Sequence, residues 1–581
     1  MAAPTIPARL FGQAQTRPDA PAYFVRGETD WAPTNWSTYA GHVRQAAKAL
    51  LAFGIKGGDV ICILGNNRPE WCEMDLGAMC INAIPAGIYQ TCSPEEIVYI
   101  LNHSEAQIIL VDTEAQWAKI NSIRAEVPHL KRIVLMNGLS VEDDTAQTWA
   151  DFLASGSSID DAQIDEAVAA LKPNDPATFI YTSGTTGPPK AVMLSHHNLA
   201  WTAEAARDVV GQTDVDTSLS YLPLSHIAEQ MFTLHAPITT GARVYFAQSI
   251  DQMPDNLKEV QPTVFFGVPR VWEKFHAGIA GKLKLAQGIK LKLVNFARRT
   301  GTAVAERKCV GEPITGALAI KYKLANKLIF SKLKPAIGMG NARICVSGAA
   351  PIAPDVLAFM ASLDLVILEV YGQSEDAGPT TFNLAGQTRF GTVGRRLQGV
   401  DVKIAEDGEI LVRGPNVFLG YYKDEEATNA ALDADGWLYS GDLGAFDSDG
   451  YLTITGRKKD IIITAGGKNI APKNIEAALM EHEAVSQAVV IGDRRKFLSA
   501  VIAIDPEQFA SGEGDAAAFE ASVSAHIETI NQRFARVEHI RKFSILPREL
   551  DQENGELTPT MKIKRRIVYE NWAEIIDGMY D

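Results

Sequence analysis

The sequence predicts an α/β protein with partly parallel sheets flanked by helices, a β-rich subdomain and a smaller α+β domain at the C-terminal end. Three observations support this prediction. Short apolar segments alternate with longer amphipathic ones through most of the chain, as in parallel sheets covered by helices. After about residue 385, short β-like segments separated by glycine follow one another directly. With 581 residues, the chain is too long for one hydrophobic core.

Apolar runs followed by turn residues mark the strands expected in the first part of the chain. They are residues 59–64, 106–111, 177–181, 263–268, 342–347 and 364–371. Beyond residue 385 we expect an antiparallel region that includes segments 408–414, 450–456 and 460–467. The last part returns to alternation, with helices expected at 474–482 and 515–535 and strands at 484–492 and 498–504.

Composition excludes several classes of protein. The net charge of −15 disfavours a nucleic-acid binder, which needs a basic surface to displace counterions. The six cysteines form no CxxC pair and have no histidine cluster beside them, so we expect reduced thiols and neither disulfides nor a zinc site. The first residues lack the apolar core of a signal peptide, and no apolar run is long enough to span a membrane. We therefore expect a cytoplasmic protein, either soluble or peripheral on the inner face of a membrane.

One segment departs from the acidic character of the chain. Residues 281–340 contain thirteen Lys and Arg residues and only two Glu residues, a local charge of +11. Two interpretations stay open. The segment is either a solvated helical insertion on the surface, or a surface that attracts anionic membranes, where each Lys or Arg contributes roughly 1 kcal/mol.

The strongest local signal for chemistry is the loop Tyr181-Thr-Ser-Gly-Thr-Thr-Gly-Pro-Pro-Lys190. An apolar strand segment leads into small residues whose backbone N–H groups can converge on phosphate oxygens, and Lys190 adds a positive charge. The loop is not of the GxxxxGK[ST] type, because two prolines separate the last glycine from the lysine. Taken alone, it could equally be an ordinary glycine-rich turn.

Four later segments complete the set. Tyr371-Gly-Gln-Ser-Glu375 follows an expected strand, at the edge where α/β sheets bind ligands, and its carboxylate suits Mg²⁺. Tyr439-Ser-Gly-Asp442 places a carboxylate after a glycine turn, where it could accept hydrogen bonds from a ribose diol. Segments 456–476 and 557–566 combine charged turns with Gly-Gly and Lys-rich stretches. Each of these has a plain alternative as a solvated loop or turn.

In this order and approximate spacing, the five segments resemble the motifs of the adenylate-forming superfamily: acyl- and aryl-CoA synthetases, luciferases and peptide-synthetase adenylation domains. The resemblance covers nearly the whole chain and is closest to the long-chain fatty acyl-CoA synthetase branch. Segments 222–230 and 347–352 also fit it. The resemblance implies an N-terminal domain over 1–457 that binds ATP and the acyl group, and a small mobile C-terminal domain over 458–581.

The resemblance also implies roles for individual residues. Nucleotide-binding positions around the triphosphate are Thr182, Ser183, Gly184, Thr185, Thr186, Gly187 and Lys190. Gly348, Ala349, Ala350, Tyr371, Gly372 and Ser374 would lie near the adenine, and Asp442 and Arg457 would hold the ribose. Glu375 and Thr185 would bind Mg²⁺, and Lys562 would be the adenylation lysine. His226 would lie near the reacting carboxylate, although it could instead be a histidine buried in the core. Lys459 would be the hinge and Gly466 would border the coenzyme A tunnel.

Two positions depart from the pattern of many relatives. Met561 stands where they have glycine, and Ser374 stands where they have threonine. Neither change removes a functional group that the resemblance implies.

The resemblance thus predicts a ligase that uses ATP, Mg²⁺ and coenzyme A to activate a fatty acid, without nucleic acid. Lys562, Glu375, His226 and Thr185 are the expected catalytic residues. Within the superfamily, an aryl- or short-chain acyl-CoA synthetase or an enzyme that loads a carrier protein remains an alternative. Outside it, the alternative is a catalytically silent lipid- or nucleotide-binding protein.

Overall fold

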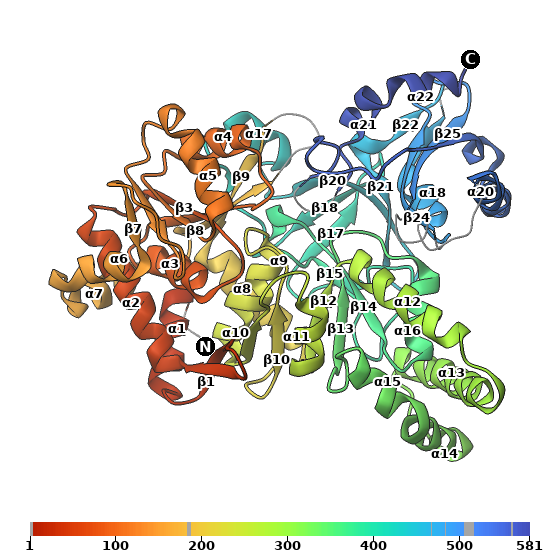
Figure 1. Cartoon of the computed structure of the whole chain (residues 1–581), viewed down its shortest axis with the longest axis horizontal. Coiled ribbons are helices and arrows are strands. Elements are labelled where there is room, and N and C mark those ends of the chain that lie inside the picture. The colour runs from red at the N-terminus through yellow and green to blue at the C-terminus, as the bar shows by residue number, and fades with distance from the viewer. Residues whose placement is uncertain (1–3, 183–187, 466–467, 483, 505–515, 559–561) are drawn as a thin grey trace.

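The structure is a computed structural model that describes residues 4–182, 188–465, 468–482, 484–504, 516–558 and 562–581. Figure 1 shows the N-terminal elements on one side, the helices of segment 281–340 projecting at the lower right, and the C-terminal elements above them. None of the helices in these ranges is long and apolar enough to cross a membrane.

The largest sheet has eight strands, and most of its pairs are parallel. Its order is β19 (Gly420–Tyr421), β9 (Lys190–Ser195), β8 (Pro176–Thr182), β4 (Ile84–Ile88), β3 (Val60–Leu64), β5 (Ile108–Val111), β6 (Arg132–Leu135) and β7 (Ala146–Thr148). Strands β8 to β7 pair in parallel, whereas β9 and β19 are antiparallel to their neighbours. Strand β3 is buried along its whole length. This explains its continuous apolar run, because helices cover both faces of such a sheet.

Two further sheets complete the N-terminal part. One has the order β10 (Thr217–Ser220), β11 (Arg243–Phe246), β1 (Pro21–Arg26) and β2 (Trp31–Asn35). The other has the order β12 (Val264–Gly267), β13 (Ile344–Ser347), β14 (Ile367–Tyr371), β15 (Thr381–Phe382) and β16 (Arg395–Arg396). The first three strands of this second sheet are parallel, so their carboxyl ends meet at one edge.

Helices fill the connections between these strands. They are α1 (Ile6–Thr16), α2 (Trp36–Ala52), α3 (Pro69–Cys80), α4 (Pro94–Ser104), α5 (Glu114–Ser122), α6 (Trp149–Ser155), α7 (Asp161–Ala170), α8 (His196–Val210), α9 (Ile227–Gln230), the π-helix η3 (Met231–His235), α10 (Ala236–Thr240), α11 (Met253–Val260), α16 (Pro354–Ser362) and α17 (Glu425–Ala431). The connection between β12 and β13 is longer and holds α12 (Pro269–Lys284), α13 (Gly288–Cys309), α14 (Gly316–Ala325), the π-helix η4 (Asn326–Phe330) and α15 (Ser331–Ala336).

The antiparallel region expected after residue 385 is present. It is the sheet β17 (Asp401–Ile404), β18 (Glu409–Arg413), β20 (Leu438–Phe446) and β21 (Leu452–Arg457). The C-terminal part contains the pair β22 (Ile462–Ile463) and β23 (Asn469–Ile470), the sheet β24 (Val485–Ile491), β25 (Leu498–Ile504) and β26 (Ile540–Ile545), and the helices α18 (Pro472–Leu479), α20 (Ala516–Asn531), α21 (Arg565–Asn571) and α22 (Ala573–Gly578).

These elements confirm the predicted fold class. Each of the six apolar segments expected as strands contains one, at β3, β5, β8, β12, β13 and β14. Segment 281–340 is helical, as one of its two interpretations assumed. The division of the chain at residue 457 stays a prediction. Arg457 ends β21, and Lys459 lies exposed in the 3₁₀ turn η6 (Lys458–Asp460) directly after it.

Candidate active site

Two predicted site segments lie side by side, because β13 and β14 are parallel neighbours that end at the same edge of the sheet. Gly348 follows the end of β13, and Gly372 follows the end of β14. Both positions require glycine: an added Cβ would lie 2.6 Å from Val370 Cγ1 at Gly348, and 1.5 Å from the Gly378 carbonyl oxygen at Gly372. Beyond Gly348, the exposed Ala349 and Ala350 border this edge, and Ala349 adopts a φ of 70°.

The residues expected to hold the ribose form one hydrogen-bonded group. Tyr371 Oη donates to Asp442 Oδ2 at 3.0 Å, and Arg457 Nε donates to Asp442 Oδ1 at 2.8 Å. Asp442 and Arg457 are register partners in β20 and β21, whereas Tyr371 comes from the end of β14. Burial raises the pKa of Tyr371 well above its usual value, so its hydroxyl stays a donor. Each carboxylate oxygen retains a lone pair for a further donor.

Glu375 is oriented by a tyrosine that the sequence analysis missed. It lies in the 3₁₀ turn η5 (Ser374–Asp376), and its Oε1 accepts a hydrogen bond of 2.8 Å from Tyr421 Oη. The Lys190 ammonium lies 4.9 Å from the centroid of the same tyrosine ring. Tyr421 belongs to β19, which pairs with β9, the strand that begins at Lys190. This strand pairing brings Lys190 and Glu375 to one phenol ring, although 185 positions separate them in the chain.

The donor set fits a Mg²⁺ ion that is bound mainly by substrate. Among the described residues, no group of three or more His, Cys, Asp or Glu side chains could hold a metal by itself. Mg²⁺ usually takes one or two protein carboxylates and completes its shell with water and substrate phosphates. Glu375 is half-buried and supplies one such carboxylate.

Lys562 lies in a cationic environment close to these groups. The positive charges of Arg457 and Lys473 act on its ammonium, and the negative charges of Asp442 and Glu375 oppose them. The surrounding protein, followed by the two cations, lowers the pKa of Lys562 to about 8. The residue nevertheless keeps solvent access. The structure therefore brings Lys562 together with Glu375, Asp442 and Arg457, from segments far apart in the chain.

His226 caps the first turn of α9. Its Nδ1 accepts a hydrogen bond of 3.1 Å from the Ala228 N–H, which leaves Nε2 as the protonated nitrogen of a neutral ring. Burial, followed by the charge of Lys562, lowers the pKa of His226 to about 4. His226 can therefore donate a hydrogen bond near Lys562, but it is not a cation at neutral pH.

The remaining predicted residues fall into two groups. Thr182 is the register partner of Lys190 across β8 and β9, so the phosphate loop connects the ends of two paired strands, and Ser374 is buried in the turn that carries Glu375. Ser183, Gly184, Thr185, Thr186, Gly187 and Gly466 lie outside the described residues.

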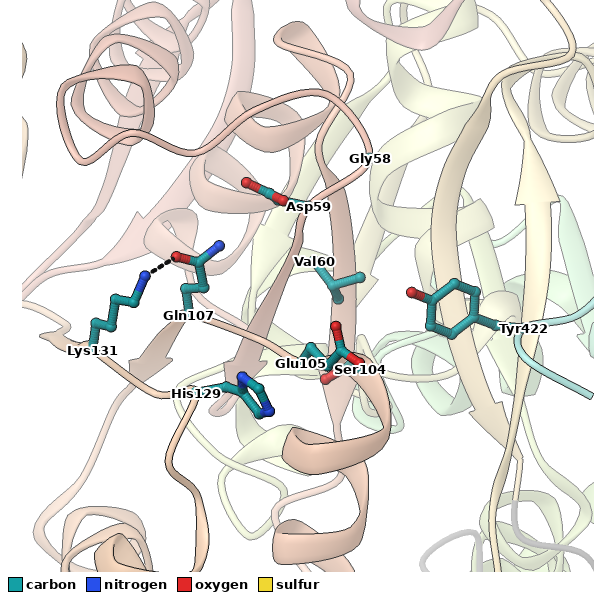
Figure 2. A pocket seen from close by; sticks show the side chains of 9 residues that line it. All are labelled: Gly58, Asp59, Val60, Ser104, Glu105, Gln107, His129, Lys131 and Tyr422. Atoms are coloured by element: carbon teal, nitrogen blue, oxygen red, sulfur yellow. Dashed lines mark hydrogen bonds between the residues drawn. The ribbon is translucent and has the colours of Figure 1, made fainter.

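A polar cavity lies away from the site residues described so far. A cavity of about 220 Å³ is lined by polar residues that include Asp59, Gln107 and Lys131 (Figure 2). These residues precede β3, β5 and β6, so the cavity lies at the amino ends of the parallel strands, whereas the phosphate loop leaves the carboxyl end of β8. None of the predicted site residues lines the cavity.

Besides Tyr421, the sequence analysis missed Lys473. It lies on α18, with its ammonium 3.7 Å from Asp460, and it influences Lys562. It falls within segment 456–476, which was singled out, but no local pattern distinguishes it from the other lysines there.

The chain is similar to known proteins over most of its length. Residues 10–422 match the family model "AMP-binding enzyme", and residues 459–581 match "AMP-binding enzyme C-terminal domain". The chain is 37% identical to the long-chain-fatty-acid–CoA ligase ACSBG2 of Xenopus laevis, over 95% of this chain and 80% of that protein. It is 36% identical to the long-chain-fatty-acid–CoA ligase FadD15 of Mycobacterium tuberculosis, over 99% of this chain and 97% of that protein.

A solved structure shares the fold over nearly the whole chain. The A domain of carboxylic acid reductase from Segniliparus rugosus, in complex with AMP and a co-purified carboxylic acid, superposes with a TM-score of 0.77 at 19% identity, covering 99% of this chain and 94% of that one. With two consecutive family models matching most of its length and relatives above 30% identity, the chain belongs to the AMP-binding enzyme family.

Proposed function

We propose that this protein is an acyl-CoA synthetase that converts a long-chain fatty acid, ATP and coenzyme A into acyl-CoA, AMP and pyrophosphate. The observation that carries the proposal is the meeting of Lys562 with Glu375, Asp442 and Arg457. A lysine within electrostatic range of two carboxylates, one placed to bind a ribose and one suited to Mg²⁺, matches the needs of a reaction at the α-phosphate of ATP. Silent binding of a nucleotide would not require this lysine.

The first half-reaction is substitution at phosphorus. A carboxylate oxygen of the fatty acid attacks the α-phosphorus, the bond to the β-phosphate bridging oxygen breaks, and pyrophosphate leaves with its electron pair. No proton has to be transferred, so positioning and charge stabilisation dominate catalysis. The Lys562 ammonium would neutralise charge that gathers on the α-phosphate oxygens. Neutral His226, with Nε2 protonated, would orient the attacking carboxylate by donating a hydrogen bond to its other oxygen.

Other residues would hold the nucleotide. Asp442 would accept hydrogen bonds from the ribose hydroxyls through the lone pairs that Tyr371 and Arg457 leave free. Gly372 has no side chain, so it would let the base approach the backbone closely. Mg²⁺ bound through Glu375 would supply positive charge to the phosphate oxygens, as in other phosphoryl chemistry. Tyr421 would hold the Glu375 carboxylate in one orientation.

The second half-reaction transfers the acyl group. The coenzyme A thiolate attacks the carbonyl carbon of the acyl-adenylate, the mixed anhydride bond breaks, AMP leaves, and the thiol proton passes to solvent. We propose that the C-terminal domain, residues 458–581, turns about Lys459 between the halves, so that Lys562 withdraws and Gly466 borders the incoming thiol arm.

The names of the relatives favour a long-chain acid over the alternatives. The two relatives described above, which exceed 35% identity, are named long-chain-fatty-acid–CoA ligases. An aryl- or short-chain acid, or a carrier protein as acceptor, remains the alternative within the family. Peripheral contact with a membrane is a separate proposal that concerns segment 281–340.

The test measures products and substrate range together. The purified protein is incubated with ATP, Mg²⁺, coenzyme A and fatty acids of graded chain length, and nucleotide products are separated by chromatography. We expect AMP, pyrophosphate and thioester, with the highest kcat/KM for long chains. ADP and phosphate as products would refute the adenylate mechanism, and a preference for short or aromatic acids would refute the substrate assignment.

A further inference from the structure

The basic segment 281–340 forms an unusual surface on helices α12 to α15. Its local charge is +11, so the rest of the chain carries −26. In Figure 1, α13 and α14 project away from the sheets at the lower right. Several of its lysines are exposed and form no ion pair within the part of the chain that the structure describes: Lys282, Lys290, Lys292, Lys321, Lys323, Lys327 and Lys332. Among the described residues, the charges of these seven lysines are therefore not neutralised by ion pairs.

The same helices expose large aliphatic side chains. Leu285, Ile289 and Ile320 are 80%, 78% and 72% exposed, the highest values among large hydrophobic residues in the described ranges. Leu285 directly follows α12, Ile289 lies in the first turn of α13, and Ile320 lies on α14. The three most exposed large aliphatic side chains of the described residues thus all belong to this one helical insertion, as is typical of an interaction surface.

Lysines and aliphatic residues share the outward face of α14 and η4. Ile320, Lys323, Leu324 and Lys327 are all exposed and follow one another at helical spacing. The opposite stripe faces the protein: Tyr322 and the buried Ala325 and Phe330 belong to a small apolar cluster with Ala297 of α13. The outward face of α14 and η4 therefore carries exposed aliphatic side chains next to exposed lysines.

Specific contacts fix these helices on the α/β body. Asp364, whose side chain is 2% exposed, binds the ammonium groups of Lys308 at 2.6 Å and Lys334 at 3.0 Å. Helix α13 also passes α16 so closely that a Cβ at Gly301 would lie 2.1 Å from the Ser362 carbonyl oxygen. These contacts hold α13 and α15 against the α/β body.

We propose that this face docks on an anionic lipid bilayer, with the lysines at the lipid phosphates and with Leu285, Ile289 and Ile320 inserted among the acyl chains near the headgroups. Charge complementarity and exposed aliphatic residues together favour a bilayer. A nucleic acid would gain nothing from the aliphatic residues. A protein partner is disfavoured because lysine is depleted at protein interfaces. The inference goes beyond the proposed catalytic function, and it would stand if the acid were of another kind.

The experiment uses the full-length protein and two kinds of vesicle, phosphatidylcholine alone and phosphatidylcholine with phosphatidylglycerol. Co-sedimentation is measured over a range of salt concentrations. The charge variant combines Lys282→Gln, Lys290→Gln and Lys292→Gln. Its matched control combines Lys56→Gln, Lys172→Gln and Lys496→Gln, which removes three exposed lysines from other surfaces. The apolar variant combines Ile289→Ser and Ile320→Ser, and thermal unfolding checks that each variant keeps its fold.

We expect the wild-type protein to bind the anionic vesicles and to lose binding as salt shortens the Debye length. The charge variant should bind about 100-fold more weakly, from the combined attraction of three lysines near such a surface, and the control should stay within about threefold of wild type. The apolar variant should bind about tenfold more weakly. Thioester formation with a water-soluble acid should be the same in all variants, which separates this test from that of the catalytic function.

Four outcomes would overturn the proposal: no binding to anionic vesicles at low salt, equal losses in the charge variant and its control, tighter binding to double-stranded RNA than to vesicles, or concentration-dependent dimerisation that the apolar variant abolishes. The last outcome would identify a second copy of the chain as the occupant of this face.

Discussion

The alkaline pH dependence of adenylate formation should report the ionisation of Lys562. The reaction requires the ammonium form, because its charge offsets charge on the α-phosphate. Surrounding protein and the cations Arg457 and Lys473 lower its pKa to about 8, from a usual value of about 10.4. A lowered lysine pKa means that the charged form is lost at lower pH. The adenylation rate should therefore fall as pH rises through 8, not through 10.

The size of the effect follows from this value. At pH 7 about 91% of the Lys562 side chains are protonated, and at pH 9 about 9% are, so the rate should fall about tenfold over this range. Each further pH unit should lower it about tenfold. A change at the neighbouring Lys473 should shift this pH dependence. Lys473→Met removes a positive charge, so the pKa of Lys562 should rise and the fall in rate should move to higher pH.

The assay is pyrophosphate exchange, which measures the first half-reaction alone, at saturating ATP and fatty acid between pH 6.5 and pH 9.5. Lys562→Arg is the matched control, because arginine stays charged throughout this range. Its rate should be lower overall but should not fall near pH 8. Thioester formation from supplied acyl-adenylate serves as a second control and should rise with pH, as the thiol ionises.

Two results would refute this reasoning. A fall near pH 8 that persists unchanged in Lys562→Arg would assign the ionisation to another group. A rate that stays constant up to pH 9.5 in the wild type would mean that solvent access keeps the pKa of Lys562 near its usual value.

Three other predictions follow from the contacts. Tyr421→Phe removes the donor to Glu375, so the Mg²⁺ concentration at half-maximal pyrophosphate exchange should rise about tenfold; an unchanged value would exclude this orienting role. Asp364→Asn leaves two lysine partners without their carboxylate and should lower the unfolding free energy by about 3 kcal/mol, measured by urea denaturation; a loss below about 0.5 kcal/mol would contradict it. Lys562→Ala should abolish pyrophosphate exchange but convert supplied acyl-adenylate to thioester, and Gly466→Leu should do the reverse; equal impairment of both halves in both variants would argue against domain alternation.

The sequence alone predicted the elements that depend on local pattern. The strands at 59–64 and 364–371 were recognisable because a strand buried on both faces needs a continuous apolar run, and both are strands in the structure, as β3 and β14. Segment 281–340 is helical in the structure, as one of its two interpretations assumed. Glu375 was singled out because it follows an expected strand, and Asp442 because a glycine turn was expected before it; in the structure Asp442 lies within β20. Their roles stay predictions, as do those of the phosphate loop and Gly466, which lie outside the described residues.

Only the tertiary structure decided which side chains meet. Tyr421 contacts Glu375 because β19 pairs with β9 at the edge of the large sheet, and nothing in the residues around Tyr421 indicates this pairing. The pKa of Lys562 is likewise lowered first by the surrounding protein and then by Arg457 and Lys473, which the fold brings near from more than 80 residues away in the chain. Apolar periodicity is a local property of the chain and can be recognised in it. Hydrogen bonds and electrostatic interactions depend on distances through space, and these are fixed only when the sheets and the two parts of the chain pack together.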